Sequence, residues 1–156
     1  MGSPMLVTAD ERLDELGLVV PAFPELPFRP RLRPVVVHGG LAYLSGLGPI
    51  GTSGVVGADV SFEEAYQAAR ATGLLAFRRI LDEFGELERV ERWVKVLGFV
   101  RSAPGFGDQP GVINGFTDLV VEVYGEERGL AARSAIGVSE LPAGIPVEVE
   151  VAVALR

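Results

Sequence analysis

The carboxy-terminal stretch GLAARSAIGVSELPAGIPVEVEVAVALR, residues 129–156, decides the fold of this chain. It holds two runs rich in valine and small residues, 130–138 and 145–155, and a turn-forming Leu-Pro-Ala-Gly sequence separates them. In the second run, valines alternate with Glu148, Glu150 and two alanines, so one face of the strand is apolar. We therefore predict two strands, the second of which packs one face against a core.

Two helical patterns and one further strand precede this stretch. A capping box at Ser61 begins an apolar stripe of helical spacing that ends at Gly85, and a second stripe runs from Pro110 to Gly125. Between them, residues 90–101 are apolar on both alternating faces. One face carries Val94, Val96 and Val100, and the other carries Trp93, Leu97 and Phe99. Helices cover only one face of a small two-layer domain, so we expect another subunit to cover the second face.

A hairpin and a glycine-rich stretch come earlier in the chain. Apolar runs at 35–37 and 41–45 flank His38-Gly39-Gly40, which is typical of a β-hairpin and makes His38 a turn residue. The glycines that follow match the spacing of the dinucleotide-binding fingerprint; they are Gly46, Gly48 and Gly51. That fingerprint requires a helix that opens at the glycines, whereas the next helix signal comes ten residues later. Nucleotide binding is therefore not expected there.

The first residues of the chain predict an extension that precedes the hairpin. A capping box predicts a short helix at 9–16, and five prolines between residues 21 and 34 favour an extended strap. We divide the chain into this extension, 1–34, and one domain, 35–156. The initial MGSP resembles an expression-tag remnant, which makes Met5 the expected native start.

The order of the predicted elements gives the fold class. Strands and helices follow one another as β-β-α-β-α-β-β, and 156 residues suit a single domain with a real core. We predict an α+β two-layer sandwich in which a mixed β-sheet carries both helices on one face.

Composition restricts the chemistry and the partners. The formal net charge of −7 opposes the basic surface that nucleic acids require. The chain has no cysteine and a single histidine, which disfavours thiolate chemistry, zinc sites and histidine-based triads. No apolar run is long enough to span a bilayer, and no signal-peptide pattern is present. We expect a cytoplasmic protein that needs no metal or cofactor and does not bind membranes.

Arg133 is a single charge among small and apolar residues. If the two carboxy-terminal strands pair as a hairpin, Glu148 lies opposite or near it. The pair can be a structural ion pair, and Glu148 can belong to a solvated strand face. Alternatively, Arg133 binds the carboxylate of a small substrate through two parallel hydrogen bonds, while Glu148 handles a proton or a water.

The sequence from 132 to 154, ARSAIGVSELPAGIPVEVEVAVA, resembles the carboxy-terminal signature of the RidA/YjgF family of enamine and imine deaminases. GGLAYLSGLGP, residues 39–49, resembles the first hairpin of that family. The resemblance runs from about Val35 to Leu155, and the extension is similar to that of the longer YjgF-like branch, whose members carry the name endoribonuclease. It implies a chorismate-mutase-like fold and a homotrimer with sites between subunits.

The resemblance also implies residue roles. Arg133 would bind the substrate carboxylate, Glu148 would serve the catalytic water, and the main chain at Ala135 would help to hold that water. Asn114 and Ser45 match further positions near the substrate, although Asn114 can equally bond locally on its helix. Two positions depart from the family pattern: no tyrosine precedes the first hairpin, and the usual Ser-Gly-Gln continues from Ser45 as Ser-Gly-Leu.

Three functions follow as expectations. The first is hydrolysis of small 2-imino or 2-enamino acids to 2-oxo acids and ammonia, without a cofactor. The second is a binding or regulatory module that holds small carboxylates without turnover. The third is an endoribonuclease, against which the acidic charge and the absence of a histidine pair argue.

Overall fold

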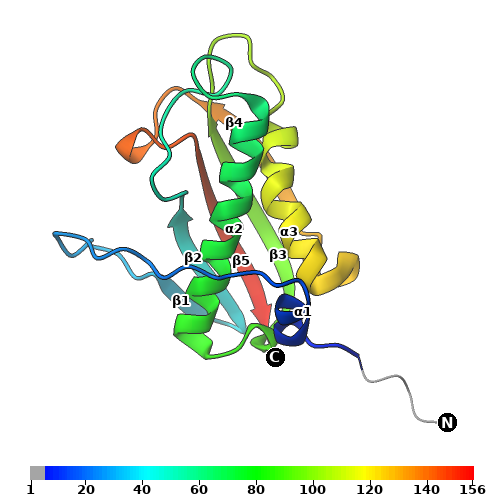
Figure 1. Cartoon of the computed structure of the whole chain (residues 1–156). Coiled ribbons are helices and arrows are strands. Elements are labelled where there is room, and N and C mark those ends of the chain that lie inside the picture. The colour runs from blue at the N-terminus through cyan, green and yellow to red at the C-terminus, as the bar shows by residue number, and fades with distance from the viewer. Residues whose placement is uncertain (1–5) are drawn as a thin grey trace.

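The computed structural model describes residues 6–156, so the expected tag remnant and Met5 lie outside the described residues. A mixed five-stranded sheet carries two long helices on one face, as predicted, and a short amino-terminal helix lies at one end (Figure 1). The strands are β1 (Val35–His38), β2 (Leu41–Leu47), β3 (Val90–Arg101), β4 (Ala132–Val138) and β5 (Val147–Leu155). The helices are α1 (Ala9–Glu15), α2 (Phe62–Phe84) and α3 (Gln109–Gly129), with the 3₁₀ turns η1 (Leu87–Arg89) and η2 (Pro142–Gly144).

The strand order corrects the predicted pairing of the last two strands. The order across the sheet is β1-β2-β5-β3-β4, so β3 lies between β4 and β5. β4 is an edge strand parallel to β3, and β5 is antiparallel to both β2 and β3. The β3–α3–β4 segment is a crossover unit, which joins parallel neighbours. A hairpin between 130–138 and 145–155 is therefore not formed.

Both long helices begin where the sequence places them. Ser61 caps α2 through a reciprocal capping box with Glu64, and Gly85 ends the helix in the left-handed region. Asp108 caps α3 by accepting a hydrogen bond from the main-chain N–H of Gly111. The predicted end at Gly125 is wrong. Gly125 has φ 76°, so the chain kinks there, and a further turn continues to Gly129.

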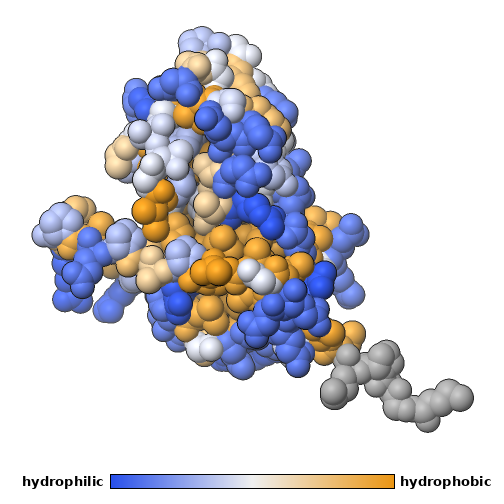
Figure 2. All heavy atoms as spheres, in the orientation of Figure 1, coloured by the Kyte–Doolittle hydropathy of each residue, from blue (hydrophilic) through white to orange (hydrophobic). Residues whose placement is uncertain are grey.

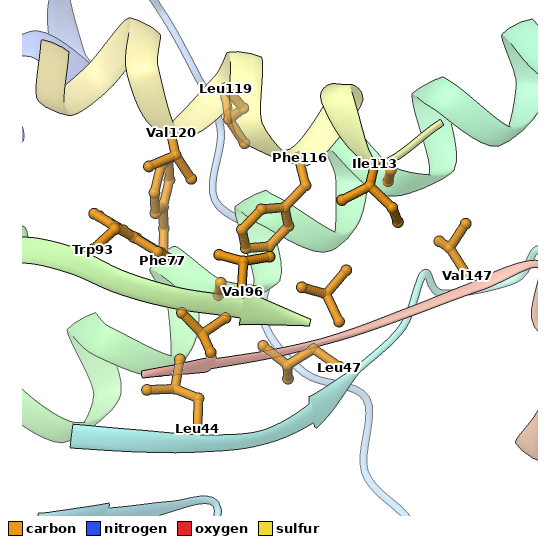
Figure 3. Close-up of a cluster of buried hydrophobic side chains, with 14 of the residues drawn as sticks. Leu44, Leu47, Phe77, Trp93, Val96, Ile113, Phe116, Leu119, Val120 and Val147 are labelled. Carbon is orange, nitrogen blue, oxygen red and sulfur yellow. The ribbon is translucent and has the colours of Figure 1, made fainter. Parts of the chain in front are cut away.

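The core lies between the sheet and the two long helices (Figure 3). Trp93 of β3 packs edge-on against Phe77 of α2 and against Phe116 and Tyr124 of α3. The sequence pattern placed Trp93 on the face away from Val96, and this is wrong. Pairing with β5 shifts between Trp93 and Lys95, and such a bulge turns Trp93 to the helix side.

The opposite face of the sheet has no covering element among residues 6–156 (Figure 1). Leu97 and Phe99 of β3 are only partly buried there, and Tyr43 and Ile136 are exposed. We call this surface the open face. A hollow in it is lined by residues of β2, β3 and β5, including Tyr43, Leu97 and Glu150. No helix within residues 6–156 has the length and apolar character that crossing a membrane requires.

The amino-terminal helix is fixed to the body by reciprocal polar contacts. The carboxylate of Asp10 accepts hydrogen bonds from the main-chain N–H groups of Leu87 and Glu88, at 2.9 Å each. The Glu88 carboxylate in turn accepts one from Ala9 at 2.8 Å and forms an ion pair with Arg128. Residues 16–34 then run as a strap across α2 toward β1 (Figure 1).

The close contact of α2 with α3 yields a stability prediction. A Cβ atom at Gly115 would lie 2.0 Å from the main-chain oxygen of Tyr66, so Gly115→Ala must push the helices apart. We expect a loss of about 1–3 kcal/mol in unfolding free energy, because overpacking outweighs the higher helix propensity of alanine. Denaturant unfolding measures it. Gly107→Ala is the control because the space beside Gly107 is open, and equal stability of the two variants would contradict the prediction.

Candidate active site

Arg133 lies on β4, at the edge of the sheet, and its side chain reaches α3. The Nη1 group donates to Oδ1 of Asn114 at 2.8 Å and to Oγ1 of Thr117 at 3.0 Å. The Nη2 group donates to the main-chain oxygen of Pro110 at 3.4 Å. These acceptors are all neutral, and within residues 6–156 Arg133 forms no ion pair. The guanidinium is thus oriented, yet its charge is not compensated.

Glu148 lies on β5 and its side chain is on the open face, half-buried and opposite Phe99 of β3. Burial raises the pKa of its carboxyl group above the ordinary value, and the neighbouring Glu150 adds to that rise. No hydrogen bond or ion pair to the Glu148 side chain is present in the described part of the chain. The folded protein therefore holds a carboxylate that accepts a proton more readily than an ordinary glutamate.

A glycine makes room for this carboxylate. A Cβ atom at Gly46 of β2 would lie 3.0 Å from both Cδ and Oε1 of Glu148. The β2–β5 register shifts between Leu44 and Leu47, which places Gly46 in a bulge beside Glu148. The sequence analysis did not predict a role for Gly46 at this site. Its position directly after Ser45, a predicted site residue, is the feature of the sequence that could have indicated one.

Arg133 and Glu148 point to different sides of the sheet. Arg133 is paired with Val96 of β3, and Val96 is paired with Val151 of β5, so these three side chains share the helix face. Glu148 is three residues from Val151 along the same strand, which places its side chain on the open face. An Arg133–Glu148 ion pair within one chain, the structural alternative, is therefore not formed.

The structure brings Asn114 to Arg133 but leaves Ser45 and Ala135 with other neighbours. Ser45 donates its hydroxyl hydrogen to the main-chain oxygen of Arg33 at 2.7 Å, which ties the strap to β2. Ala135 is half-buried on β4, two residues after Arg133 and on the same face. Thr117 was not predicted as a partner of Arg133. Its position one helical turn after Asn114 was the signal that could have found it.

The arrangement offers an anion site and a base. The oriented guanidinium of Arg133 can take a carboxylate in a bidentate hydrogen bond. The Glu148 carboxylate can take a proton from a water. Among residues 6–156 no three histidine, aspartate or glutamate side chains gather in a way that could hold a metal ion.

Two comparisons cover nearly the whole chain. Atu1372 of Agrobacterium tumefaciens, a solved protein of unknown function, is 32% identical, with a TM-score of 0.84 over 95% of this chain and 92% of that one. A solved protein from Shewanella oneidensis MR-1, named a "putative endoribonuclease", is 25% identical, with a TM-score of 0.87 over 95% of this chain and 99% of that one.

Other comparisons cover less of the chain. Escherichia coli TdcF, solved with bound serine, is 20% identical and shares the fold, with a TM-score of 0.55 over 83% of this chain and 91% of that one. Protein TCP17 of Trypanosoma cruzi is 44% identical over 104 residues, which are 67% of this chain and 65% of TCP17. The match thus spans just under two thirds of TCP17. The family model for endoribonuclease L-PSP matches residues 28–155. The chain therefore belongs to the endoribonuclease L-PSP family, which is also called the YjgF/RidA family.

Proposed function

We propose that the protein hydrolyses small 2-imino and 2-enamino acids to 2-oxo acids and ammonia, at sites formed between the copies of a homotrimer. One observation carries this proposal. Arg133 and Glu148 are both without a counter-charge among the described residues, and they lie on opposite faces of the sheet. An anion site of one copy can complete a reaction centre only when a second copy brings its own Glu148 to it.

The proposed reaction needs only these groups and water. Arg133 binds the substrate carboxylate and places the imine carbon for attack. Glu148 accepts a proton from water as the oxygen bonds to that carbon, and the proton then passes to the nitrogen. This gives a carbinolamine, whose hydroxyl proton passes to the nitrogen as the carbon–nitrogen bond breaks, so that ammonia leaves and a carbonyl remains. A 2-enamino acid enters the same step as its imine tautomer. The main chain of Ala135, on an edge strand whose outer groups have no partner in the sheet, would help to hold the water.

In this proposal Asn114 orients the Arg133 side chain, and Ser45 lies beside the substrate. Asn114 holds the Arg133 guanidinium from α3, so the fork is oriented before the substrate arrives. Ser45 is expected to contribute to the substrate side of the site. Its hydroxyl group is bonded to Arg33, which fixes the β2 bulge beside Glu148.

A small-carboxylate binding module is the second candidate. E. coli TdcF was solved with serine, an amino acid that is not an imine. The same geometry can hold such a carboxylate without turnover. An endoribonuclease is disfavoured because the chain has a net charge of −7 and its one histidine, His38, ends β1 at the hairpin turn.

Ammonia release decides between turnover and binding. Iminobutyrate or aminoacrylate is generated in the cuvette, and ammonia is followed with and without the protein. We expect release faster than the uncatalysed rate. A rate equal to the uncatalysed one, together with tight binding of 2-oxobutyrate or serine, would favour the binding module instead.

The assembly gives a prediction of its own. The open face exposes apolar side chains, and a trimer in which these faces meet removes them from water. Sedimentation equilibrium at micromolar concentration should give three times the monomer mass of 16.6 kDa. A species near 16.6 kDa would contradict both the trimer and the shared site.

Arg133→Lys should lose nearly as much activity as Arg133→Ala. Lysine keeps the charge but lacks the planar fork that donates hydrogen bonds to Asn114, Thr117 and a carboxylate together. The measurement is kcat/KM for ammonia release beside the affinity for 2-oxobutyrate. If a folded Arg133→Lys variant binds 2-oxobutyrate as the parent does, Arg133 is not the anchor.

Glu148→Gln should lower kcat by roughly 10²-fold while it leaves stability unchanged or higher. The raised pKa of Glu148 in the single chain means that folding favours the protonated, neutral side chain. The group therefore adds to the free energy of unfolding at low pH, and this contribution is lost as the pH rises through the pKa of the folded protein. Glutamine stays neutral at every pH, so the variant does not lose this stability at neutral pH. Thermal melts of parent and variant test it. A clear drop in the melting temperature would instead identify Glu148 as a structural ion-pair partner.

The ionisation of Glu148 predicts the pH dependence of turnover. Glu148 must be ionised to accept a proton, so kcat should rise with pH through the pKa of this group, which burial and Glu150 raise in the single chain and which Arg133 of a second copy lowers in the shared site. The pH–rate profile of the parent measures this rise in kcat, and the rise should disappear in Glu148→Gln. If kcat of that variant still rises over the same pH range, another group causes the rise.

A further inference from the structure

Residues 24–34, the second part of the strap, form an arm that projects from the body just before β1 (Figure 1). Its three large apolar side chains, Leu26, Phe28 and Leu32, are all exposed, and Phe28 keeps 65% of its surface in solvent. These residues lie in a short segment that has neither helix nor strand structure. Such an apolar arm is costly in water unless another surface covers it.

A groove lies between the arm and the body. Its volume is about 860 Å³, and the body contributes Leu75 and Arg79 of α2 together with Gly48 and Ile50 after β2. The guanidinium of Arg79 is stacked on the ring of Phe23 at 3.9 Å, which holds that wall in place. Figure 2 shows apolar side chains gathered where the strap crosses the body.

The charge of the arm is opposite to that of the rest of the chain. The arm carries Arg29, Arg31 and Arg33 against one glutamate, Glu25. Subtracting this net +2 from the total of −7 leaves −9 on the remaining residues. Within residues 6–156 none of the three arginines forms an ion pair. A basic arm therefore complements the acidic body of another copy.

The base of the arm is attached beside the proposed site. Ser45 binds the main-chain oxygens of both Arg33 and Pro34, at 2.7 and 3.0 Å. The next residue, Gly46, lies against the Glu148 carboxylate. The arm thus leaves the body at the point where a second copy must approach Glu148 with its Arg133.

We propose that the arm docks on a second copy of this chain and closes the shared site. The partner covers Leu26, Phe28 and Leu32 and enters the groove, and the arm arginines face its acidic surface. This inference rests on the proposed function only in requiring an assembly with sites between copies. It assigns to residues 24–34 a role as an interface element, so loss of the arm contacts weakens assembly first and turnover as a consequence.

Paired substitutions test the docking. Phe28→Asp should raise the dissociation constant of the assembly by roughly tenfold or more, because it places a charge where an apolar anchor is buried. Val19→Asp is the matched control: Val19 is 80% exposed, lies in the strap and does not line the groove. Sedimentation velocity over a dilution series measures both variants. Equal dissociation constants for Phe28→Asp, Val19→Asp and the parent would overturn the proposal.

A fluorescent label gives a second readout that does not depend on losing the assembly. The chain has no cysteine, so Phe28→Cys or Val19→Cys can carry a single bimane label. The label at position 28 should shift its emission to the blue as the protein concentration rises through the assembly range, and the label at position 19 should not. A shift that appears only when a small carboxylate is added would make the groove a ligand site and overturn the proposal.

The outcomes separate this inference from the proposed function. If the parent releases ammonia as a trimer and Phe28→Asp leaves the trimer and the rate unchanged, the arm proposal fails alone. If the parent is a monomer at all concentrations, both fail. Phe28 is exposed in the single chain, so the variant should fold, and its circular dichroism melt checks this.

Discussion

Packing of two helices against one face of a five-stranded sheet is the constraint on which the rest of this molecule depends. Gly115 lets α2 and α3 meet without a side chain between them, and both helices then cover β3 and β5 from the same side. Because strand side chains alternate, the apolar residues of β3 that point away from the helices remain on the open face. Within one chain, the helices thus cover one face of the sheet and leave the apolar side chains of the open face partly in contact with water.

The same alternation places the two charged residues of the candidate site on different faces of the sheet. Arg133 lies on the helix face at the sheet edge, and α3 supplies the neutral acceptors that orient its side chain. Glu148 follows the open face, where partial burial without a cation raises its pKa. Two charged groups without counter-charges cost the fold stability, and such groups are characteristic of sites that await a ligand or a partner. In the proposed assembly a second copy brings its Arg133 to Glu148, and the arm docks on that copy.

Local sequence signals predicted the elements well and their long-range arrangement less well. Ser61 and Gly85 gave the ends of α2 because capping depends on neighbouring residues. The placement of β4 beside β3 depends on the crossover through α3, which no residue of β4 specifies. The bulge that turns Trp93 to the helices depends on pairing with β5. Period counting cannot detect it.

The candidate site shows the same division. Arg133 and Glu148 could be selected from their types and surroundings in the sequence, whereas their positions on opposite faces follow from strand order. Subunit complementation tests that arrangement directly. Arg133→Ala and Glu148→Gln are co-expressed, and the mixed trimers are assayed for ammonia release. If each site takes Arg133 from one copy and Glu148 from another, random mixing restores roughly a quarter of the sites and of the parent activity. Mixed trimers as inactive as the two separate variants would contradict the shared site.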